Sequence, residues 1–492
     1  NLYPTSTYHY NSGGEPADIP NLTYDEFKQF YKTHYHPSNA IFITFGDIPA
    51  SEHQQRFQEQ ALQRFEKLDK RIAVTEEQRY TKPQYFEETY AYDSQQDDSG
   101  SEDKTHIVIA WLLGNSTNLE DGMSARLLAS VLLDNSGSPL QKALETTNLG
   151  SSPSPMCGLE DSQLELCFAC GIEGANPEQA DAVEAMVLQV LNDVAENGLP
   201  YEQVAASLHQ LELSQREISG GSYPYGLNLI LTALTSATHR GDPVSLLDLD
   251  PVLEKLKQQI QDPDYIKSLA RKLLLDNNHR IRLVLKPDTQ LAQAKDAAEK
   301  QQLDSIKQAL SDEQKQAIIA SAEALKQRQE MEEDLNILPK VDISDIPKES
   351  SFSDPTGREF KSIPITSYAA GTNGIAYQQM IMPLPELSAE QMDLLPLYST
   401  CVTEMGVGNL DYQQTQLWHS SVVGSYSAAT AVRTHREDLN QLHGNLTFAC
   451  KGLASNQQAM SELMEESFTQ ARFDEFSRLE ELVAQILTHR ES

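Results

Sequence analysis

The sequence predicts an α+β protein built of repeated units, and three observations support this prediction. Apolar stretches typical of strands alternate with stretches that begin with helix caps and are rich in helix-forming residues. The pattern Leu166-Cys-Phe-Ala-Cys170 returns far downstream as Leu446-Thr-Phe-Ala-Cys450. Between the two copies, the run from Pro287 to Pro339 contains no other proline and no glycine, so it lacks the residues that break helices.

The first 80 residues are expected to hold two helices and a strand. Thr23-Tyr-Asp-Glu26 and Ser51-Glu-His-Gln54 have the spacing of capping boxes, which start helices. A β-branched and aromatic run predicts the strand. The expected elements are a helix over 23–34, a strand over 39–45 and a helix over 51–68.

Residues 80–288 are expected to form one complete unit. Its first two strands are expected to pair through an acidic loop over 93–103 that is rich in Ser. Asn176 followed by Pro177 is typical of a helix start, with the asparagine as the cap. The expected strands are 84–92, 105–113, 164–172 and 280–285, and the expected helices are 121–133, 140–146, one from 176, one from 201, one ending near 238, 251–260 and 265–275.

The run between Pro287 and Pro339 predicts two charged helices, about 291–310 and 312–335, folded back on each other. Ser311-Asp-Glu-Gln314 has capping-box spacing and marks the start of the second helix. The apolar stripe on both helices is thin, so they cannot form a core by themselves. Two interpretations remain open, a solvated spacer and a hinge hairpin that joins two similar halves.

After a linker over 341–364, the order of elements repeats. A strand is expected over 374–382, then a helix from Ser388 to about 404, a strand over 446–450, and two helices to the C-terminus. In both units the repeated pattern is followed by an asparagine, Asn176 or Asn456, at the expected start of a helix. Residues 24–45 match the end of a unit, so the chain is expected to begin with the tail of one unit and to end inside a third. Its uncovered sheet edges would then need a partner outside the chain.

The net charge of −34 argues against a nucleic-acid partner, because binding to phosphates requires basic patches. An acidic cleft would attract a cationic ligand, although the charge could equally serve only to keep the protein in solution. No apolar run is long enough to cross a membrane. The five cysteines do not form a disulfide framework, and Cys167 and Cys170 lie in a strand-like apolar run, which favours buried thiols over a metal site.

The sequence contains neither HExxH nor HxxEH, the two motifs that place two zinc-binding imidazoles on one helix face beside a glutamate. His209-Gln-Leu-Glu212 has one histidine and the glutamate, and a solvated helix face is expected there. His34 and His36 are too close together to chelate a metal well, and capping or packing roles are expected. No phosphate loop, dinucleotide fingerprint or nucleophile elbow is present. The residues alone therefore predict no active site.

Several motifs resemble the presequence protease branch of the pitrilysin/insulinase zinc metallopeptidases. The resemblance extends over essentially the whole chain. The motifs are Ser12-Gly-Gly-Glu-Pro16, Leu22-Thr-Tyr-Asp-Glu-Phe27, His34-Tyr-His-Pro-Ser-Asn39, Ser138-Pro-Leu140 and Thr372-Asn-Gly-Ile-Ala-Tyr377.

This resemblance implies four homologous units of mostly antiparallel sheet flanked by helices, arranged as two halves around a peptide-digesting chamber, with a helical hairpin between the halves. It also implies a division of this chain. The implied parts are 1–75 as the C-terminal part of the first unit, 80–288 as a complete, metal-free second unit, 290–338 as the hinge hairpin, 339–364 as a linker, and 365–492 as an incomplete third unit.

The resemblance implies no catalytic or metal-binding residue in this chain. The zinc ligands of the family are expected upstream of Asn1, and its assisting Arg/Tyr pair beyond Ser492. The helix over 121–133 stands where the zinc helix would be, with Ala, Arg, Leu and Ser in place of ligands. Two sets of residues remain as candidates, Ser12, Gly13 and Gly14 in a peptide-chamber loop, and Ser311 and Gln314 in the hinge hairpin.

The expected function is that of the central chamber wall and hinge of a zinc metalloendopeptidase that degrades short, unstructured, basic peptides. The alternative is a catalytically inactive peptide-binding or partner subunit. Zinc would belong to the parent enzyme, and this chain alone is expected to bind none and to be inactive. The expected partners are a peptide substrate and the remaining units of the same protein, with no nucleic acid and no membrane, in a bacterial cytoplasm or an organelle matrix.

Overall fold

The structure is a computed structural model that describes residues 1–69, 72–92, 104–135, 137–218, 223–338, 340–349, 354–435 and 437–491. The chain divides into two compact units. The larger comprises residues 1–89, 98–287 and 372–492, and the smaller comprises 90–97 and 288–371. The fold is α+β, with antiparallel sheets flanked by helices, as the sequence predicts.

The main sheet of the larger unit has the strand order β1-β6-β2-β5-β3, with β4 also paired to β5. Its strands are β1 (Gln84–Ala91), β2 (Thr105–Asn115), β3 (Ser152–Pro153), β4 (Gly158–Glu160), β5 (Glu165–Ala175) and β6 (Arg280–Asp288). β2 is antiparallel to both β5 and β6. We refer to residues 80–288, which contain this sheet, as the second repeat, a number taken from the division that the resemblance implies.

The predicted pairing of strand 84–92 with strand 105–113 is wrong, because β6 lies between β1 and β2. β2 is an almost continuously buried strand, whereas β1 is largely exposed. A buried strand needs hydrogen-bonding partners on both edges, and the outer position falls to the more polar strand. The loop 93–103, expected to join the two strands, lies outside the described residues.

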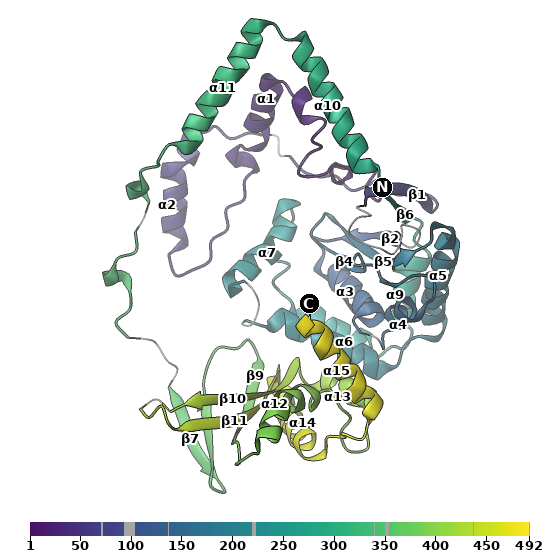
Figure 1. The fold of residues 1–492 in the computed structure, drawn as a ribbon, viewed down its shortest axis with the longest axis vertical. Coiled ribbons are helices and arrows are strands. Elements are labelled where there is room, and N and C mark those ends of the chain that lie inside the picture. Colours follow the sequence, from purple (N-terminus) through teal and green to yellow (C-terminus); the bar gives the residue numbers. More distant parts are fainter. Residues whose placement is uncertain are drawn as a thin grey trace. The chain divides into compact units, whose positions relative to one another are not determined.

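Helices cover one face of this sheet (Figure 1). They include α3 (Leu119–Leu133), α4 (Pro139–Thr146), α5 (Ala180–Asn197), α6 (Tyr201–Arg216), α8 (Asp250–Gln259) and α9 (Tyr265–Ala270). α9 continues as one π-helical turn over Arg271–Leu275. A further helix, α7 (Tyr225–Thr238), follows α6 in the chain. The rings of Trp111 and Phe168 are fully buried at the centre, with 5.9 Å between their centroids. On the other face, Leu2 and Tyr3 from the start of the chain pack against β2.

The early part of the chain departs from prediction in two places. The helices are α1 (Tyr24–His34) and α2 (Ala50–Gln60), with 3₁₀ turns at Thr7–His9, Ile19–Asn21, Pro37–Asn39 and Leu62–Arg64. The capping box of Thr23 and Glu26 is present, but α2 follows Pro49 and ends eight residues before 68, without a cap from Ser51. The predicted strand over 39–45 is also wrong, because no described strand lies beside these residues to pair with them.

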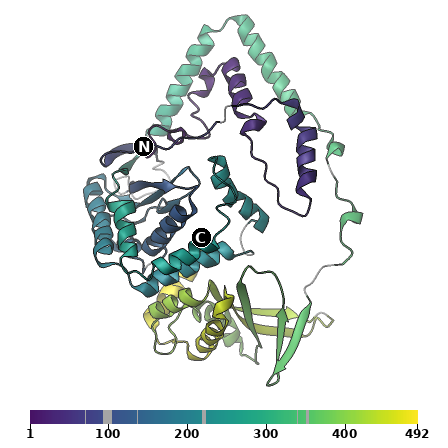
Figure 2. The same ribbon diagram turned by 180° about the vertical axis from the view of Figure 1, so that it is seen from behind.

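A second sheet, with the order β10-β11-β9, lies in residues 365–492, which we refer to as the third repeat. Figure 2 shows it with its helices. The strands are β9 (Ile375–Pro383), β10 (Ser425–Thr434) and β11 (Leu442–Leu453), and the helices are α12 (Ala389–Cys401), α13 (Tyr412–Val422), α14 (Gln457–Gln470) and α15 (Phe476–Glu491). Ser388 and Gln391 form the predicted cap of α12. A further capping box, at Asp411 and Gln414, starts α13, which the sequence analysis missed.

The repeated pattern occupies equivalent positions in the two repeats. Leu166, Phe168 and Cys170 alternate along β5 and enter the core of the second repeat. Leu446, Phe448 and Cys450 do the same on β11 in the third. A short 3₁₀ segment and a helix follow each strand. The predicted internal repeat is therefore confirmed.

The smaller unit contains α10 (Leu291–Ala309), α11 (Asp312–Glu330), 3₁₀ turns at Leu335–Ile337 and Ile343–Asp345, and a hairpin of β7 (Pro355–Phe360) and β8 (Ile363–Tyr368). The capping box of Ser311 and Gln314 is present. The two helices open as a V from this turn and do not fold back on each other, because neither has a buried side chain to hold them together (Figure 1). The segment 339–364, expected to be linker, contains β7.

Candidate functional site

His34 and His36, for which capping or packing roles are expected, both contact local backbone groups. The Nδ1 atom of His34 lies 3.0 Å from the carbonyl oxygen of Phe30. The Nδ1 atom of His36 accepts a hydrogen bond from the N–H of Ser38 at 3.2 Å. Within the described part of the chain, no three His, Cys, Asp or Glu side chains are grouped closely enough to hold a metal ion. The residues that the structure describes therefore do not fit a zinc site.

His209 lies at a contact between the two repeats, so the expected solvated helix face is wrong. Its Nδ1 atom is 3.0 Å from the carbonyl oxygen of Ser420 on α13. Its Nε2 atom is 3.2 Å from Nδ2 of Asn456. Burial lowers the pKa of His209, while the Ser420 carbonyl and Glu212 act in the opposite direction. The period of a single helix cannot show that another helix, from 200 residues downstream, covers one of its faces.

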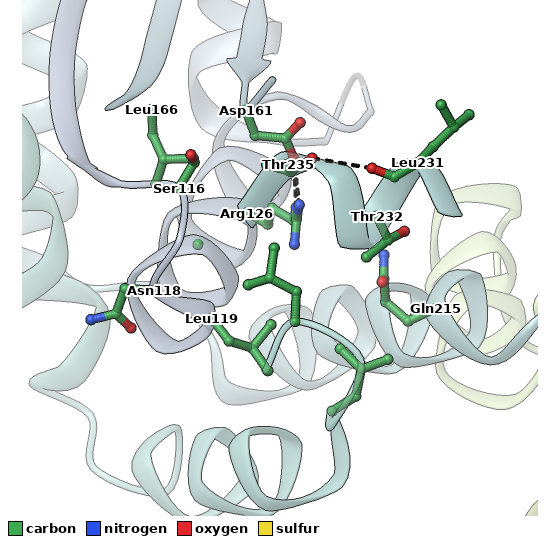
Figure 3. Close-up of a pocket in the computed structure, with 13 residues that line it drawn as sticks. Ser116, Asn118, Leu119, Arg126, Asp161, Leu166, Gln215, Leu231, Thr232 and Thr235 are labelled. Atoms are coloured by element: carbon green, nitrogen blue, oxygen red, sulfur yellow. Dashed lines mark hydrogen bonds and ion pairs between the residues drawn. The ribbon is translucent and has the colours of Figure 1, made fainter. Parts of the chain in front are cut away.

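A cavity of about 240 Å³ lies beside α3, at the helix expected to stand in place of a zinc helix. Figure 3 shows residues that line it. Its apolar wall consists of Leu119, Leu166, Leu231, Leu246 and Leu249, and its polar wall includes Ser116, Gln215, Thr232 and Thr235. Asn118 caps α3 by accepting hydrogen bonds from the N–H groups of Glu120 and Asp121, which fixes where the helix enters this wall.

The charged pair in this cavity is already satisfied. The Nε and Nη2 atoms of Arg126 lie 3.0 and 2.5 Å from Oδ2 of Asp161 (Figure 3). The hydroxyl of Ser116 donates to the carbonyl oxygen of Leu164 at 3.0 Å. A guanidinium is always protonated and cannot ligate zinc. The cavity thus offers apolar contact and hydrogen bonds, which suit binding better than acid–base chemistry.

The loop of Ser12, Gly13 and Gly14 is an exposed turn. The Oδ1 atom of Asn11 accepts a hydrogen bond from the N–H of Gly13 at 3.1 Å, and its Nδ2 donates to the carbonyl oxygen of Gly14 at 3.3 Å. Gly14 has a φ of 81°, which favours glycine. This accounts for the glycine as a turn residue, and a role in a peptide chamber stays a prediction.

The cysteines are free thiols. Cys170 is buried and Cys167 is half-buried on the opposite face of β5. Burial raises the pKa of Cys167 to about 12, so this thiol stays protonated and unreactive near neutral pH. The expectation of ordinary buried thiols at these two positions is confirmed.

Two family models match the chain. The M16 peptidase inactive domain matches residues 21–211, and the peptidase-associated domain of M16 subfamily C matches residues 285–492. None of the described helices is long and apolar enough to span a membrane.

Curated relatives match along almost the entire chain. The mitochondrial presequence protease of Xenopus tropicalis is 30% identical over 98% of this chain and 46% of its own length. Presequence protease 1 of Arabidopsis thaliana, named chloroplastic/mitochondrial, is 28% identical over 98% of this chain and 45% of its own length. The chain spans about half the length of the curated relatives it matches.

Two solved structures also resemble this chain. The peptidase M16 inactive domain from Pseudomonas fluorescens is 18% identical, with a TM-score of 0.41 over 58% of this chain and 63% of that chain. The periplasmic protease PqqL from Escherichia coli is 14% identical, with a TM-score of 0.39 over 93% of this chain and 48% of that chain. From the family models and the relatives together, the chain belongs to the presequence protease branch of the M16, or pitrilysin/insulinase, peptidase family.

Proposed function

We propose that this chain is the central, non-catalytic portion of a zinc metalloendopeptidase that degrades short, unstructured peptides. The match of residues 21–211 to an inactive M16 domain supports this proposal, as do relatives named presequence protease. The proposed parts are the end of a first unit over 1–75, a metal-free unit over 80–288, a hinge hairpin over 290–338, a linker over 339–364 and part of a third unit over 365–492.

The observation that carries the proposal is the composition of α3. The helix has Ala125, Arg126 and Leu128 on the stretch where the family's zinc helix would present ligands. Ala125 and Leu128 are buried in the core, and Arg126 is bound to Asp161. The helix is therefore held by packing and an ion pair, as expected of a copy that serves as a wall.

The proposed substrate is a basic peptide, and the net charge of −34 supports this choice. An acidic surface raises the local concentration of a cationic peptide and speeds its encounter with the protein. The proposed location is an organelle matrix or a bacterial cytoplasm. The names of the relatives, mitochondrial in Xenopus and chloroplastic/mitochondrial in Arabidopsis, favour the matrix.

The first experiment measures zinc content of the purified 492-residue chain together with cleavage of a basic amphipathic peptide. We expect zinc far below one ion per chain and no chelator-sensitive cleavage. A circular dichroism spectrum and a cooperative thermal transition serve as controls for folding. Stoichiometric zinc with chelator-sensitive cleavage would overturn the proposal.

The second experiment measures binding of the same peptide by fluorescence anisotropy at about 50 and about 500 mM salt. Electrostatic steering predicts that affinity falls as salt screens the acidic surface, and unchanged affinity would remove basic peptides from the proposal.

The alternative of an independent, inactive subunit is tested by sequencing the gene upstream of the codon for Asn1. A reading frame that continues upstream of Asn1 into an HxxEH helix supports the enzyme portion, and a start codon at that point supports the independent subunit.

A further inference from the structure

Several polar bonds join α6 and its end to the third repeat. Gln210 donates through Nε2 to the carbonyl oxygens of Ser420 and, at 2.7 Å, Val423. Near the end of α6, Glu217 pairs with Lys451 at 2.6 Å. We refer to this contact, made by residues 209–217 on one side and by α13, β11 and the start of α14 on the other, as the α6 seam.

The α6 seam also contains an apolar contact, made by the buried side chain of Leu213. Leu213 lies against Gly424. A Cβ atom added to Gly424 would lie 3.0 Å from the Cδ1 atom of Leu213. Asn373 donates through Nδ2 to the carbonyl oxygen of Arg216 at 3.2 Å, so the backbone there is also held by a polar bond. Contacts between domains that separate and rejoin are more polar than permanent cores. The polar bonds across the α6 seam match such a releasable contact.

His209 at this seam satisfies its partners in one protonation state. The carbonyl oxygen of Ser420 can only accept, so Nδ1 of His209 carries the hydrogen. The Nδ2 group of Asn456 donates to the carbonyl oxygen of Val422 at 3.2 Å and directs its second hydrogen to Nε2 of His209. Nε2 must therefore be bare, and the neutral tautomer with its hydrogen on Nδ1 meets every requirement.

A second proton on His209 leaves a conflict that no side-chain rotation removes. A hydrogen on Nε2 would point at the amide hydrogens of Asn456. Turning that amide would offer its oxygen to the imidazolium, but would place the same oxygen against the carbonyl oxygen of Val422. Protonation therefore costs at least one of the partly buried hydrogen bonds made by His209 and Asn456 at the α6 seam.

The surrounding charges do not compensate for that proton. Glu212, on the same helix, already pairs with Arg216 at 2.9 Å and with Lys257 of α8 at 3.1 Å. Burial, which disfavours the charged form, is the largest effect and lowers the pKa of His209, while Glu212 favours its protonation and Lys257 opposes it. From the third repeat, His209 meets the neutral carbonyl of Ser420 and the neutral amide of Asn456, and Lys451 is held by Glu217.

We propose that the α6 seam is an acid-sensitive latch between the second and third repeats, closed while His209 is neutral and released when it is protonated. This inference concerns a contact within the chain, goes beyond the proposed function and does not depend on it.

The direction of the pH dependence follows from the linkage between proton binding and closing of the seam. A histidine whose pKa is lower in the closed form contributes closing free energy above about pH 6.5, and that contribution is lost as the pH falls below this value.

The test is hydrogen–deuterium exchange of the full chain at about pH 7.5 and about pH 5.5, corrected for the intrinsic exchange rate. An open form with an ordinary histidine pKa of about 6.5 gains about tenfold in population over this interval. We therefore expect protection of α13 and the second half of α6 to fall about tenfold, with α5 in the core of the second repeat unchanged. Unchanged protection of α13, or equal loss in α5, contradicts a local latch.

Two variants distinguish the contribution of His209 to the pH dependence from that of the other bonds across the α6 seam. The H209Q side chain can donate to Ser420 and accept from Asn456 without titrating, so protection of the second half of α6 should become independent of pH. Protection of α13 should keep only the pH dependence that buried His419 on that helix contributes. The matched control Q210A removes two bonds across the same seam without removing a titratable group. It should weaken protection at both pH values and keep the ratio between them. A pH-dependent loss in H209Q equal to that of the unmodified chain would overturn the proposal.

Discussion

Two asparagines at equivalent positions, Asn176 after β5 and Asn456 after β11, make different contacts. Asn176 caps the 3₁₀ turn Pro177–Gln179 that leads into α5 by accepting from the N–H of Glu178, while Gln179 accepts from the backbone N–H of Asn176. Asn456 makes no such cap and instead donates to Val422 and contacts His209. The same residue after the same strand thus serves local structure in one repeat and an inter-repeat contact in the other.

The two repeats also differ in how they accommodate a buried histidine. In the second repeat, His279 accepts from the N–H of Tyr80 at 3.0 Å through Nδ1 and lies 2.8 Å from the carbonyl oxygen of Leu2 through Nε2. In the third repeat, Nε2 of buried His419 has no hydrogen-bond partner among the described residues. Duplication of a unit therefore preserves its core pattern while its polar groups are reassigned.

The largest expected effect concerns the shared core. Phe168 and Phe448 are both almost fully buried at equivalent positions. Each change to Ala should cost about 3 to 5 kcal/mol through lost transfer free energy and a cavity. Hydrogen exchange should locate the loss of protection in the repeat that carries the variant. The exposed Leu442, changed to Ala, is the control on β11, and a loss below about 1 kcal/mol for either phenylalanine variant would contradict equivalent cores.

The next effect sharpens the difference between the histidines. Burial lowers the pKa of His419 to about 4. Its folded-state pKa is below the unfolded value, so the stabilisation is present above about pH 6.5 and should decline by about 2 kcal/mol at pH 5. Thermal unfolding between these pH values should show this decline for the third repeat. His419→Leu should reduce it, and an unchanged pH dependence in this variant would exclude His419 as its source.

A smaller effect tests the two asparagines directly. N176A should destabilise α5 by about 1 kcal/mol, because it removes a helix cap. N456A should leave α14 little changed and instead increase exchange in α13 and α6. Exchange measured on both variants compares the two roles. Equal losses in the helices that follow each asparagine would show that both are caps.

The smallest effect concerns the ion pair beside α3. The side chains of Arg126 and Asp161 are 30% and 37% exposed, so solvent screens their attraction. D161N should change the free energy of unfolding by less than about 1 kcal/mol. Denaturant unfolding measures this. A loss above about 3 kcal/mol would mean that the pair behaves as a buried one.

Features that depend on residues close in sequence were predictable. The capping boxes at Thr23, Ser311 and Ser388 form as predicted, because each joins residues three positions apart. Strands were likewise expected over 164–172 and 446–450, within the regions of β5 and β11, because a short apolar run is a local property. The absence of HExxH and HxxEH is also a property of the amino-acid sequence itself.

Features that depend on distant partners were decided by tertiary structure. The position of β6 between β1 and β2, the lack of a strand over 39–45 and the open V of α10 and α11 follow from which surfaces find a partner. The contact of His209 with Ser420 and Asn456 is of the same kind. Sequence by itself determined where helices begin and which strand faces are apolar, because those are set within a few residues. Which groups meet across the chain was decided only in the folded structure, because hydrogen bonds and packing between distant segments depend on where the chain brings them together.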